Sequence, residues 1–475
     1  MKTREMNLTE GSLLSKLIIF SLPVIGVNVL QLLFNTADIV VVSWFVSEEK
    51  ANAAVGAVGA TTPIINLMIG LFIGLSMGAN VVLSRCVGKG DAERAKRVVG
   101  SSVALSLVAG VILATLGALG AKGVLKLTNC KDELLDMATD YLTIYFIGMP
   151  VIMFYNFAAA ILRAVGDTIR PFIFLLAGGI VNVIFNIVFV TVFNMTADGV
   201  AFATVLSNAV SAVCCFVTML KSKGFCRFEF GNFRFHKSEV GEILNIGIPS
   251  GIQAMLFSVS NVIIQSSINS YGDVAVAGNS VAHTIDNYVY ESTNGFSVAM
   301  LSFVSQNLGA GKLDRVKKSL LTSIGVISVV GATVGAIVLL VAHKLCFAVR
   351  PDEAVAEIAL IRLYMLAPTY FVCSIMNAFG YTMRGMGKSI SAMFISLFGA
   401  CILRIIWIYA VERLFPGQIV WVYLSYPVTW LLTVIVYIVV ITPLFKKMQK
   451  KFDDERVSAE NSEELPVDNG DTRSA

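Results

Sequence analysis

Twelve long apolar runs constrain this chain more than any other feature of its sequence. About 20 apolar residues cross a bilayer as a helix, whereas a strand of a membrane barrel needs only about 10 and alternates in polarity. The runs here are longer than barrel strands and do not alternate. We therefore expect an all-α integral membrane protein with twelve transmembrane helices, near residues 15–44, 55–82, 98–120, 134–160, 171–194, 198–220, 243–270, 274–305, 319–345, 356–381, 391–411 and 419–443.

The composition excludes a soluble enzyme. Of the 475 residues, 56% are hydrophobic and 14% are charged, whereas soluble domains are about 25% charged. The eight cysteines contain no Cys-x-x-Cys pair, and the three histidines are too far apart for a zinc site. No arrangement of nucleophile and base indicates catalysis. We expect no enzymatic activity, no cofactor, no resident metal and no nucleic-acid partner.

The distribution of lysine and arginine indicates the orientation in the membrane. If the N-terminus is cytoplasmic, 25 of the 36 basic residues fall in the N-terminal segment, in the start of the C-terminal tail up to Lys451 and in the connections on that side. An excess of basic residues marks the cytoplasmic side. Both termini are therefore predicted to be cytoplasmic. The same assignment puts Arg362 in an outer connection and leaves Arg404 as the one arginine within a span.

The chain is an internal duplication. The segment Gly88–Lys96 (GKGDAERAK) recurs 221 residues later as Gly309–Lys317 (GAGKLDRVK), and Arg163-Ala-Val-Gly recurs as Arg384-Gly-Met-Gly. Six helices per half is an even number, so both halves begin on the same side, related by a pseudo-two-fold axis along the membrane normal. We expect an N-lobe over residues 1–220, a cytoplasmic linker over 221–240, a C-lobe over 241–445 and a disordered cytoplasmic tail over 446–475.

A polar stripe marks the first predicted helix. Asn28, Gln31, Asn35 and Asp38 are spaced 3, 4 and 3 residues apart, so they share one helix face. Such a face cannot contact lipid and must line the interior or a wet cavity. Burial there favours the protonated form of Asp38, which suits it to carry a proton or to hold Na⁺ with neighbouring oxygens. A purely structural, hydrogen-bonded carboxylate is the alternative.

Other spans carry polar residues at helical spacing. In the first half these are Asn182 and Asn186 in the fifth run, and Thr204 and Asn208 in the sixth. Glu291 is a second cation or substrate candidate, with Arg404 as a counter-charge if its role is structural. Taken singly, each polar residue can simply hold helices together. The candidates in the second half are Gln265, His283, Asn287 and Glu291, with Asp286 adjacent.

Two similar lobes suit transport by alternating access, with a receptor, channel or scaffold as the other interpretations. The chain also resembles a known family, the MATE (multidrug and toxic compound extrusion) transporters. The resemblance rests on Leu8-Thr-Glu-Gly11, on Pro23, on the Asp38 region, on the two basic Gly-x-Gly loops and on the twelve-span duplication, and it covers about 440 residues.

The resemblance implies particular site residues. In the DinF-like branch an aspartate of the first helix binds the coupling cation, and a proline fifteen residues earlier acts as a hinge; Asp38 and Pro23 have this spacing. Asn182, Asn186 and Thr204 match the rest of that site. Asn186 departs from the pattern, because a carboxylate is expected there, and its absence weakens the case for Na⁺. The glutamate of the seventh helix found in the NorM-like branch is also missing.

The resemblance further implies a function. It indicates a monomeric, multi-pass transporter of the bacterial inner membrane that exports small organic cations or amphipathic drugs in exchange for H⁺ or Na⁺, and so contributes to antibiotic resistance. A flippase for lipid-linked precursors is the alternative within the same superfamily. That activity calls for a strongly cationic cavity to hold pyrophosphate.

Overall fold

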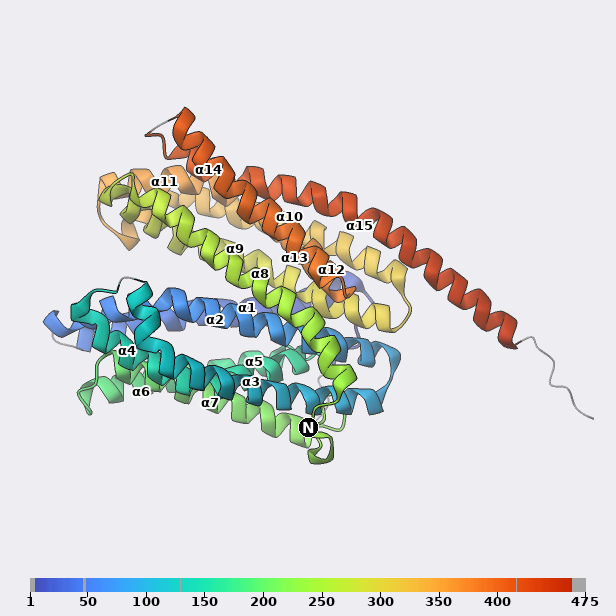
Figure 1. Cartoon of the computed structure of the whole chain (residues 1–475). Helices are drawn as coiled ribbons and strands as arrows, with labels where there is room; N and C mark the ends of the chain where they lie inside the picture. The colour runs from blue at the N-terminus through green and yellow to red at the C-terminus, as the bar shows by residue number, and fades with distance from the viewer. Residues whose placement is uncertain (1–4, 46–47, 129, 416, 464–475) are drawn as a thin grey trace, which may run out of the picture.

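The protein is almost entirely helical in a computed structural model that describes residues 5–45, 48–128, 130–415 and 417–463 (Figure 1). No strand occurs in these residues. The α-helices are α1 (Leu13–Phe45), α2 (Glu48–Lys89), α3 (Ala92–Leu127), α4 (Asp132–Ile147), α5 (Met149–Ala164), α6 (Ile169–Thr191), α7 (Ala197–Lys221), α8 (Lys237–Asn269), α9 (Asp273–Gly309), α10 (Leu313–Val349), α11 (Glu353–Leu366), α12 (Tyr370–Gly385), α13 (Ser389–Ser396), α14 (Leu403–Leu414) and α15 (Val420–Glu463).

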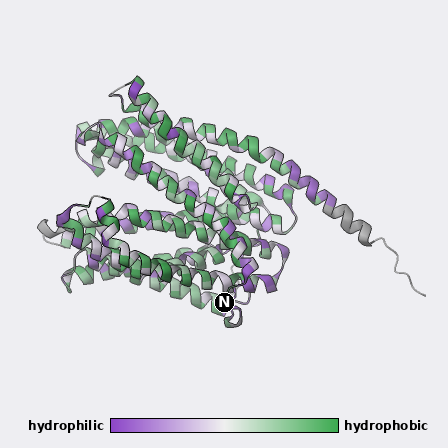
Figure 2. Ribbon diagram, viewed as in Figure 1, coloured by the Kyte–Doolittle hydropathy of each residue, from purple (hydrophilic) through white to green (hydrophobic). Residues whose placement is uncertain are grey.

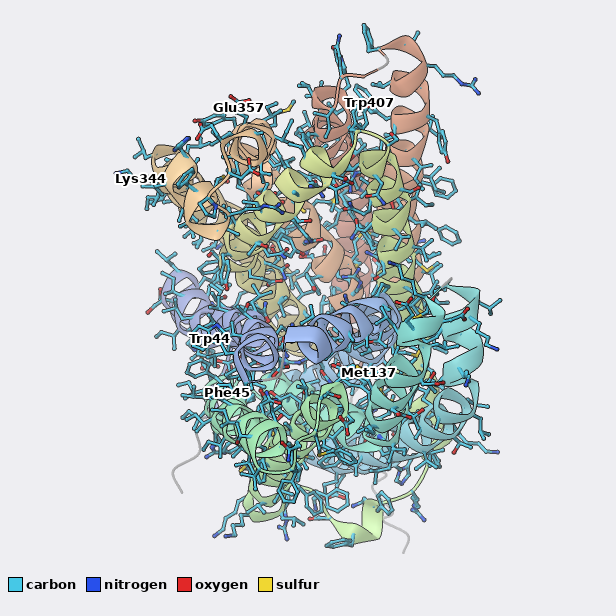
Figure 3. All side chains as sticks on the ribbon, turned by 90° about the vertical axis from the view of Figure 1, so that its left-hand side faces the viewer. Trp44, Phe45, Met137, Lys344, Glu357 and Trp407 are labelled. Atoms are coloured by element: carbon cyan, nitrogen blue, oxygen red, sulfur yellow. The ribbon has the colours of Figure 1, made fainter. Side chains whose placement is uncertain are left out.

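The helices form two bundles. Figure 1 shows α1–α7 below, here called the N-bundle, and α8–α15 above, the C-bundle. The bundles converge at one end of the molecule, where the N-terminal segment lies and where α15 leaves the C-bundle. We call this the termini end. Toward the opposite end the two bundles diverge. Figure 3 views that opposite end, with Trp44 and Met137 in the N-bundle and Glu357 and Trp407 in the C-bundle.

The twelve-helix prediction is confirmed. Within the described residues, ten helices are long and apolar enough to span a membrane, and the bent pair α4–α5 makes an eleventh. The twelfth predicted span is α9, which has the length but carries buried polar residues such as Asn279 and Asp286. It packs against α1, α2, α10, α11 and α12. Figure 2 shows apolar residues along the helix bodies and polar residues gathered toward the termini end and the outer part of α15.

Several predicted spans are interrupted. The run over 134–160 divides into α4 and α5, which meet at an angle of 48° beside Gly148 and Pro150. The run over 356–381 divides at a short 3₁₀ turn over Ala367–Thr369 that contains Pro368, and the run over 391–411 contains a π-helical stretch over Leu397–Ile402. Proline lacks an N–H and its ring clashes with the preceding turn, which explains the two proline breaks.

Glycines bring the two bundles into close contact along α2 and α8. A side chain on Gly74 would meet the backbone of Gly251, and one on Gly247 would meet the backbone of Leu75. Helices approach this closely only where small residues recur along one face. The α2–α8 contact is therefore a backbone-to-backbone seam that joins the bundles.

The C-terminal prediction needs a correction. Residues 446–475 were expected to be a disordered tail, but α15 continues as a helix through Glu463. Residues 464–475 lie outside the described part of the chain. In Figure 1 the outer part of α15 extends away from both bundles. The helix continues because residues 444–463 are rich in charged helix-forming residues and contain neither glycine nor proline.

Candidate functional site

A cavity of about 450 Å³ lies between the two bundles. Helices α1, α2, α4, α5, α6 and α7 line it from the N-bundle, and α9 and Tyr381 of α12 line it from the C-bundle. Its volume is in the range of small-molecule sites, about 300–1,000 Å³. Its charged lining residues are Asp38, Arg163 and Glu291.

The polar stripe of α1 faces this cavity. Asn28, Gln31, Asn35 and Asp38 all line it. The helix itself runs unbroken across Pro23, so the expected hinge residue is an internal proline and not the site of a break. Since the four polar residues share one face, a single orientation of α1 turns all of them away from lipid.

Asp38 lies at the centre of a small hydrogen-bonded cluster in the N-bundle. Nδ2 of Asn186 donates to Oδ1 of Asp38 at 2.5 Å and to Oδ1 of Asn182 at 3.2 Å. Nδ2 of Asn182 in turn lies 3.5 Å from Oγ1 of Thr204. The residues that the resemblance implied for the coupling site therefore lie close together, although they come from three helices, α1, α6 and α7. Asn208 also lines the cavity, one turn along α7 from Thr204.

The cluster contains an unused acceptor. Oδ1 of Asn186 is buried and has no hydrogen-bond partner among the described residues. Together with the Asp38 carboxylate, Oδ1 of Asn182 and Oγ1 of Thr204, it makes a set of oxygens suited to a hard cation or to a protonated carboxyl group. Asp38 is the one carboxylate in this described cluster, because Asn186 stands where the resemblance leads one to expect a second carboxylate.

Glu291 faces the same cavity from the C-bundle. Nδ2 of Asn28 donates to Oε2 of Glu291 at 2.6 Å, and Nδ2 of Asn294 donates to the same oxygen at 3.2 Å. The contact with Asn28 crosses between the bundles. No motif in the sequence indicated that these two residues would meet.

The other candidates of the C-bundle lie away from the cavity. His283 is exposed, and neither it nor Asn287 is among the cavity-lining residues. Oε1 of Gln265 accepts a hydrogen bond from Asn279 at 3.0 Å, outside the cavity. These residues therefore lie outside the lining of the cavity that Glu291 faces. Because α9 is packed on several sides, residues of one helix face come to lie in different surroundings along its length.

Two assignments of arginine are also corrected. Arg362, expected in an outer connection, is buried in α11, where its Nε lies 2.8 Å from Oδ2 of Asp286. Arg404 does not pair with Glu291: its guanidinium lies 4.1 Å from the ring centre of Tyr426 and contacts Oγ1 of Thr429. The buried acid that has an arginine partner is thus Asp286.

At the termini end the cavity meets contacts between the bundles. Oγ of Ser302 donates to Oδ1 of Asn80 at 3.1 Å. Beyond it, Glu242 at the start of α8 pairs with Arg85 of α2 at 2.9 Å and with Arg94 of α3 at 2.5 Å. We call Glu242, Arg85 and Arg94 the inter-bundle ion cluster. Neither Asn80 nor these ion pairs were identified from the sequence, where charge was the one available signal for the pairs.

The N-terminal segment adds a further link at this end. Leu8 is fully buried, and its backbone N–H donates to Oε1 of Gln306 at 3.1 Å. Its carbonyl accepts from Nε of Arg315 at 3.2 Å. The segment before α1 is thereby held against α9 and α10 of the C-bundle.

Together these features define an integral membrane protein of two helical bundles around a shared polar cavity. The sequence model of the MatE family matches residues 23–188 and 249–410, one match in each half. The chain belongs to the MatE family.

Curated relatives cover most of the chain. "Probable multidrug resistance protein YoeA" of Bacillus subtilis is 24% identical over 416 residues, which is 86% of this chain and 89% of the relative. "Multidrug export protein MepA" of Staphylococcus aureus is 23% identical and covers 82% of this chain and 85% of its own length.

Solved structures share the fold. An outward-facing MATE family transporter aligns with a TM-score of 0.87 at 20% identity, over 95% of this chain and all of the other. A crystal structure of MATE in the bent conformation aligns with a TM-score of 0.88 at the same identity, again over 95% of this chain and all of the other. At this level of identity the likeness extends to the fold.

Proposed function

We propose that this chain is a secondary active antiporter that exports cationic or amphipathic drugs in exchange for H⁺ or Na⁺. The observation that carries the proposal is that the Asp38 carboxylate lines a cavity shared by both bundles and accepts a hydrogen bond from the buried Asn186 behind it. Multidrug relatives in Bacillus and Staphylococcus support the substrate class. The substrates are small organic cations, and the working unit is a monomer in the bacterial inner membrane.

The coupling step takes place at Asp38. When charged, Asp38 accepts the hydrogen bond of Asn186 and stabilises the arrangement in which the cavity opens away from the termini end. Protonation, or Na⁺ binding with Asn182 and Thr204, changes the contacts of α1 within the N-bundle. Bending of α1 about Pro23 then weakens substrate binding.

The proposed orientation places the termini end in the cytoplasm, as the distribution of basic residues predicts. The bundles are held together at that end by the ion cluster and by the α2–α8 seam. This arrangement is the outward-open state of an alternating-access cycle.

Efflux from proteoliposomes tests the proposal. A cationic dye is loaded, and pH and Na⁺ gradients are imposed separately. We expect one gradient to drive dye movement in the wild type and Asp38→Asn to abolish the driven movement while the protein remains folded. Asn287→Ala, which alters an amide outside the cavity lining, is the matched control. Gradient-driven movement that is unchanged in Asp38→Asn removes the proposed role.

The two alternative functions predict other results. A flippase for lipid-linked precursors calls for a cationic cavity. The charged residues that line this cavity are one arginine, Arg163, and two acids, Asp38 and Glu291. This balance of charge favours drug antiport. A receptor or scaffold predicts no dye movement under either gradient.

A further inference from the structure

The linker between the two halves is bonded to the N-bundle along its length. Residues 222–236 connect the end of α7 to the start of α8. The backbone N–H of Phe228 donates to the carbonyl of Met219, in the last turns of α7, at 3.1 Å. Oγ of Ser101, in α3, donates to the carbonyl of Arg234 at 3.2 Å. The linker is therefore a fixed part of the surface of the N-bundle.

Aromatic rings hold this linker in place and also project from it. Phe228 is buried, and its ring centre lies 5.5 Å from that of Phe216 in α7. The ring centres of Phe230 and Phe233 lie 5.2 and 6.0 Å from that of Phe228. Phe230 is 73% exposed, Phe233 45% and Phe235 49%, and we call these three the exposed phenylalanines. Neighbouring large apolar side chains that a rigid backbone keeps exposed mark a surface for a partner or a membrane.

The linker lies on the flank of the protein, short of its end. Figures 1 and 3 show it at the edge of the N-bundle that faces away from the C-bundle. A side chain on Gly100 of α3 would meet the carbonyl of Asn232 in the linker. Gly100 comes eight residues after Ala92, where α3 begins at the termini end, so α3 continues about 12 Å past this contact. The linker thus lies beside the end of the apolar span α7, at the depth expected for lipid headgroups.

The linker is also basic. Its two acids with their neighbours, Glu229 and Glu239, lie 3.5 Å from Lys96 and 3.2 Å from Arg97 of α3. Glu229 lies 3.4 Å from Arg227 as well. Apolar rings beside basic side chains match the interface of a membrane that contains anionic lipids. Five exposed basic residues lie in or next to the linker: Lys221, Lys223, Arg227, Arg234 and Lys237.

We propose that the linker is an interfacial binding site for anionic phospholipids of the leaflet at the termini end. The exposed phenylalanines enter the region between headgroups and acyl chains, and Lys223, Arg227 and Arg234 bind the phosphate groups. This surface lies outside the cavity between the bundles. The inference therefore goes beyond the proposed transport function and does not depend on it.

Lipid binding to the purified full chain tests the proposal. Native mass spectrometry measures the affinity for phosphatidylglycerol, which is anionic, and for phosphatidylcholine, which is zwitterionic. We expect phosphatidylglycerol to bind more tightly. Lys223→Gln combined with Arg234→Gln should weaken its binding by about tenfold or more, because each basic residue near an anionic headgroup contributes a several-fold gain. Binding of phosphatidylcholine should not change.

A matched control separates this site from general attraction between charges. Lys447→Gln combined with Lys450→Gln removes two exposed positive charges from the outer part of α15 and should leave the preference for phosphatidylglycerol intact. Equal affinity for the two lipids in the wild type, or an equal loss in both double variants, overturns the proposal. Displacement of phosphatidylglycerol by millimolar inorganic phosphate would indicate a site for free phosphate and also overturns it.

The depth of the exposed phenylalanines is measured separately. Phe230→Trp places an indole at the most exposed of the three rings, and the chain is reconstituted in vesicles that contain brominated lipids. The emission of the wild type, which has four tryptophans, is subtracted. We expect bromine near the headgroup to quench the added emission more strongly than bromine near the end of the acyl chain. Quenching by aqueous iodide but by neither brominated lipid would place the ring in water and overturn the proposal.

Discussion

Nδ2 of Asn28 donates a hydrogen bond to Oε2 of Glu291 at 2.6 Å, and this bond joins the first helix of the N-bundle to the second helix of the C-bundle. Both residues line the cavity. The bond therefore connects the stripe that carries Asp38 to the acid of the opposite bundle.

Replacing Glu291 with Gln keeps the shape of this contact but removes the charge. We expect binding of a cationic dye to weaken by about tenfold, because a charged acceptor in a low-dielectric site is lost. Fluorescence polarisation with the purified protein measures the change, and Asn287→Ala, on the same helix but outside the cavity lining, is the control. Wild-type affinity in Glu291→Gln would show that Glu291 has only a structural role.

Asn186 stands where the resemblance leads one to expect a carboxylate. Asn186→Asp should place a second acid beside Asp38 and so create a site that responds to Na⁺. Thermal unfolding is measured in NaCl and in KCl, and we expect the melting temperature to rise in Na⁺ for this variant. The double variant with Asp38→Asn should lose the effect. Equal melting temperatures in the two salts would contradict the prediction.

Glu242 joins α8 to both Arg85 and Arg94. Glu242→Gln should loosen the termini end and shift the population toward separated bundles by roughly fivefold, since partly exposed ion pairs contribute modestly. Distances between spin labels introduced at Lys89 and Asp314, one on each bundle, report the change. A distance distribution identical to that of the wild type would argue against a gating role for the ion cluster.

Gly74 allows α2 to contact the backbone of α8. A methyl group on Gly74 would overlap Gly251, so Gly74→Ala should push the bundles apart at the seam and reduce transport several-fold. Gly59, also in α2, has nothing within 4 Å of the added carbon. Gly59→Ala should therefore behave like the wild type in efflux assays. If the two variants have equal activity, the seam does not require close approach.

Glu5 links the N-terminal segment to the linker before α8. Burial raises the pKa of Glu5, whose Oε1 lies 3.8 Å from Sγ of Cys226. An acid whose pKa is raised in the folded state stabilises docking of the segment at low pH, and this contribution is lost as the pH rises through the raised value. Glu5→Gln stays neutral and should keep the segment docked at alkaline pH.

Alkylation of Cys226, followed by mass spectrometry of its peptide, measures this docking. Burial raises the pKa of the Cys226 thiol to about 11, so the wild type and Glu5→Gln are compared at the same pH. We expect the wild-type thiol to react faster at mildly alkaline pH and the two rates to converge under acidic conditions. Equal rates throughout would rule out control by Glu5.

Local patterns in the sequence were sufficient for the helices and for part of the site. Apolar run length predicted the spans, because a membrane admits only helices whose backbone hydrogen bonds are satisfied internally. The spacing of the α1 stripe predicted its shared face, since helical periodicity is a local property. The resemblance named Asn182, Asn186 and Thr204, which the fold gathers beside Asp38.

Pairings between the two halves were decided by the tertiary structure alone. The bond from Asn28 to Glu291 and the burial of Arg362 against Asp286 join helices that are distant in sequence. Sequence periodicity indicates which face of a helix is polar, but only the packing of whole bundles brings two such faces together.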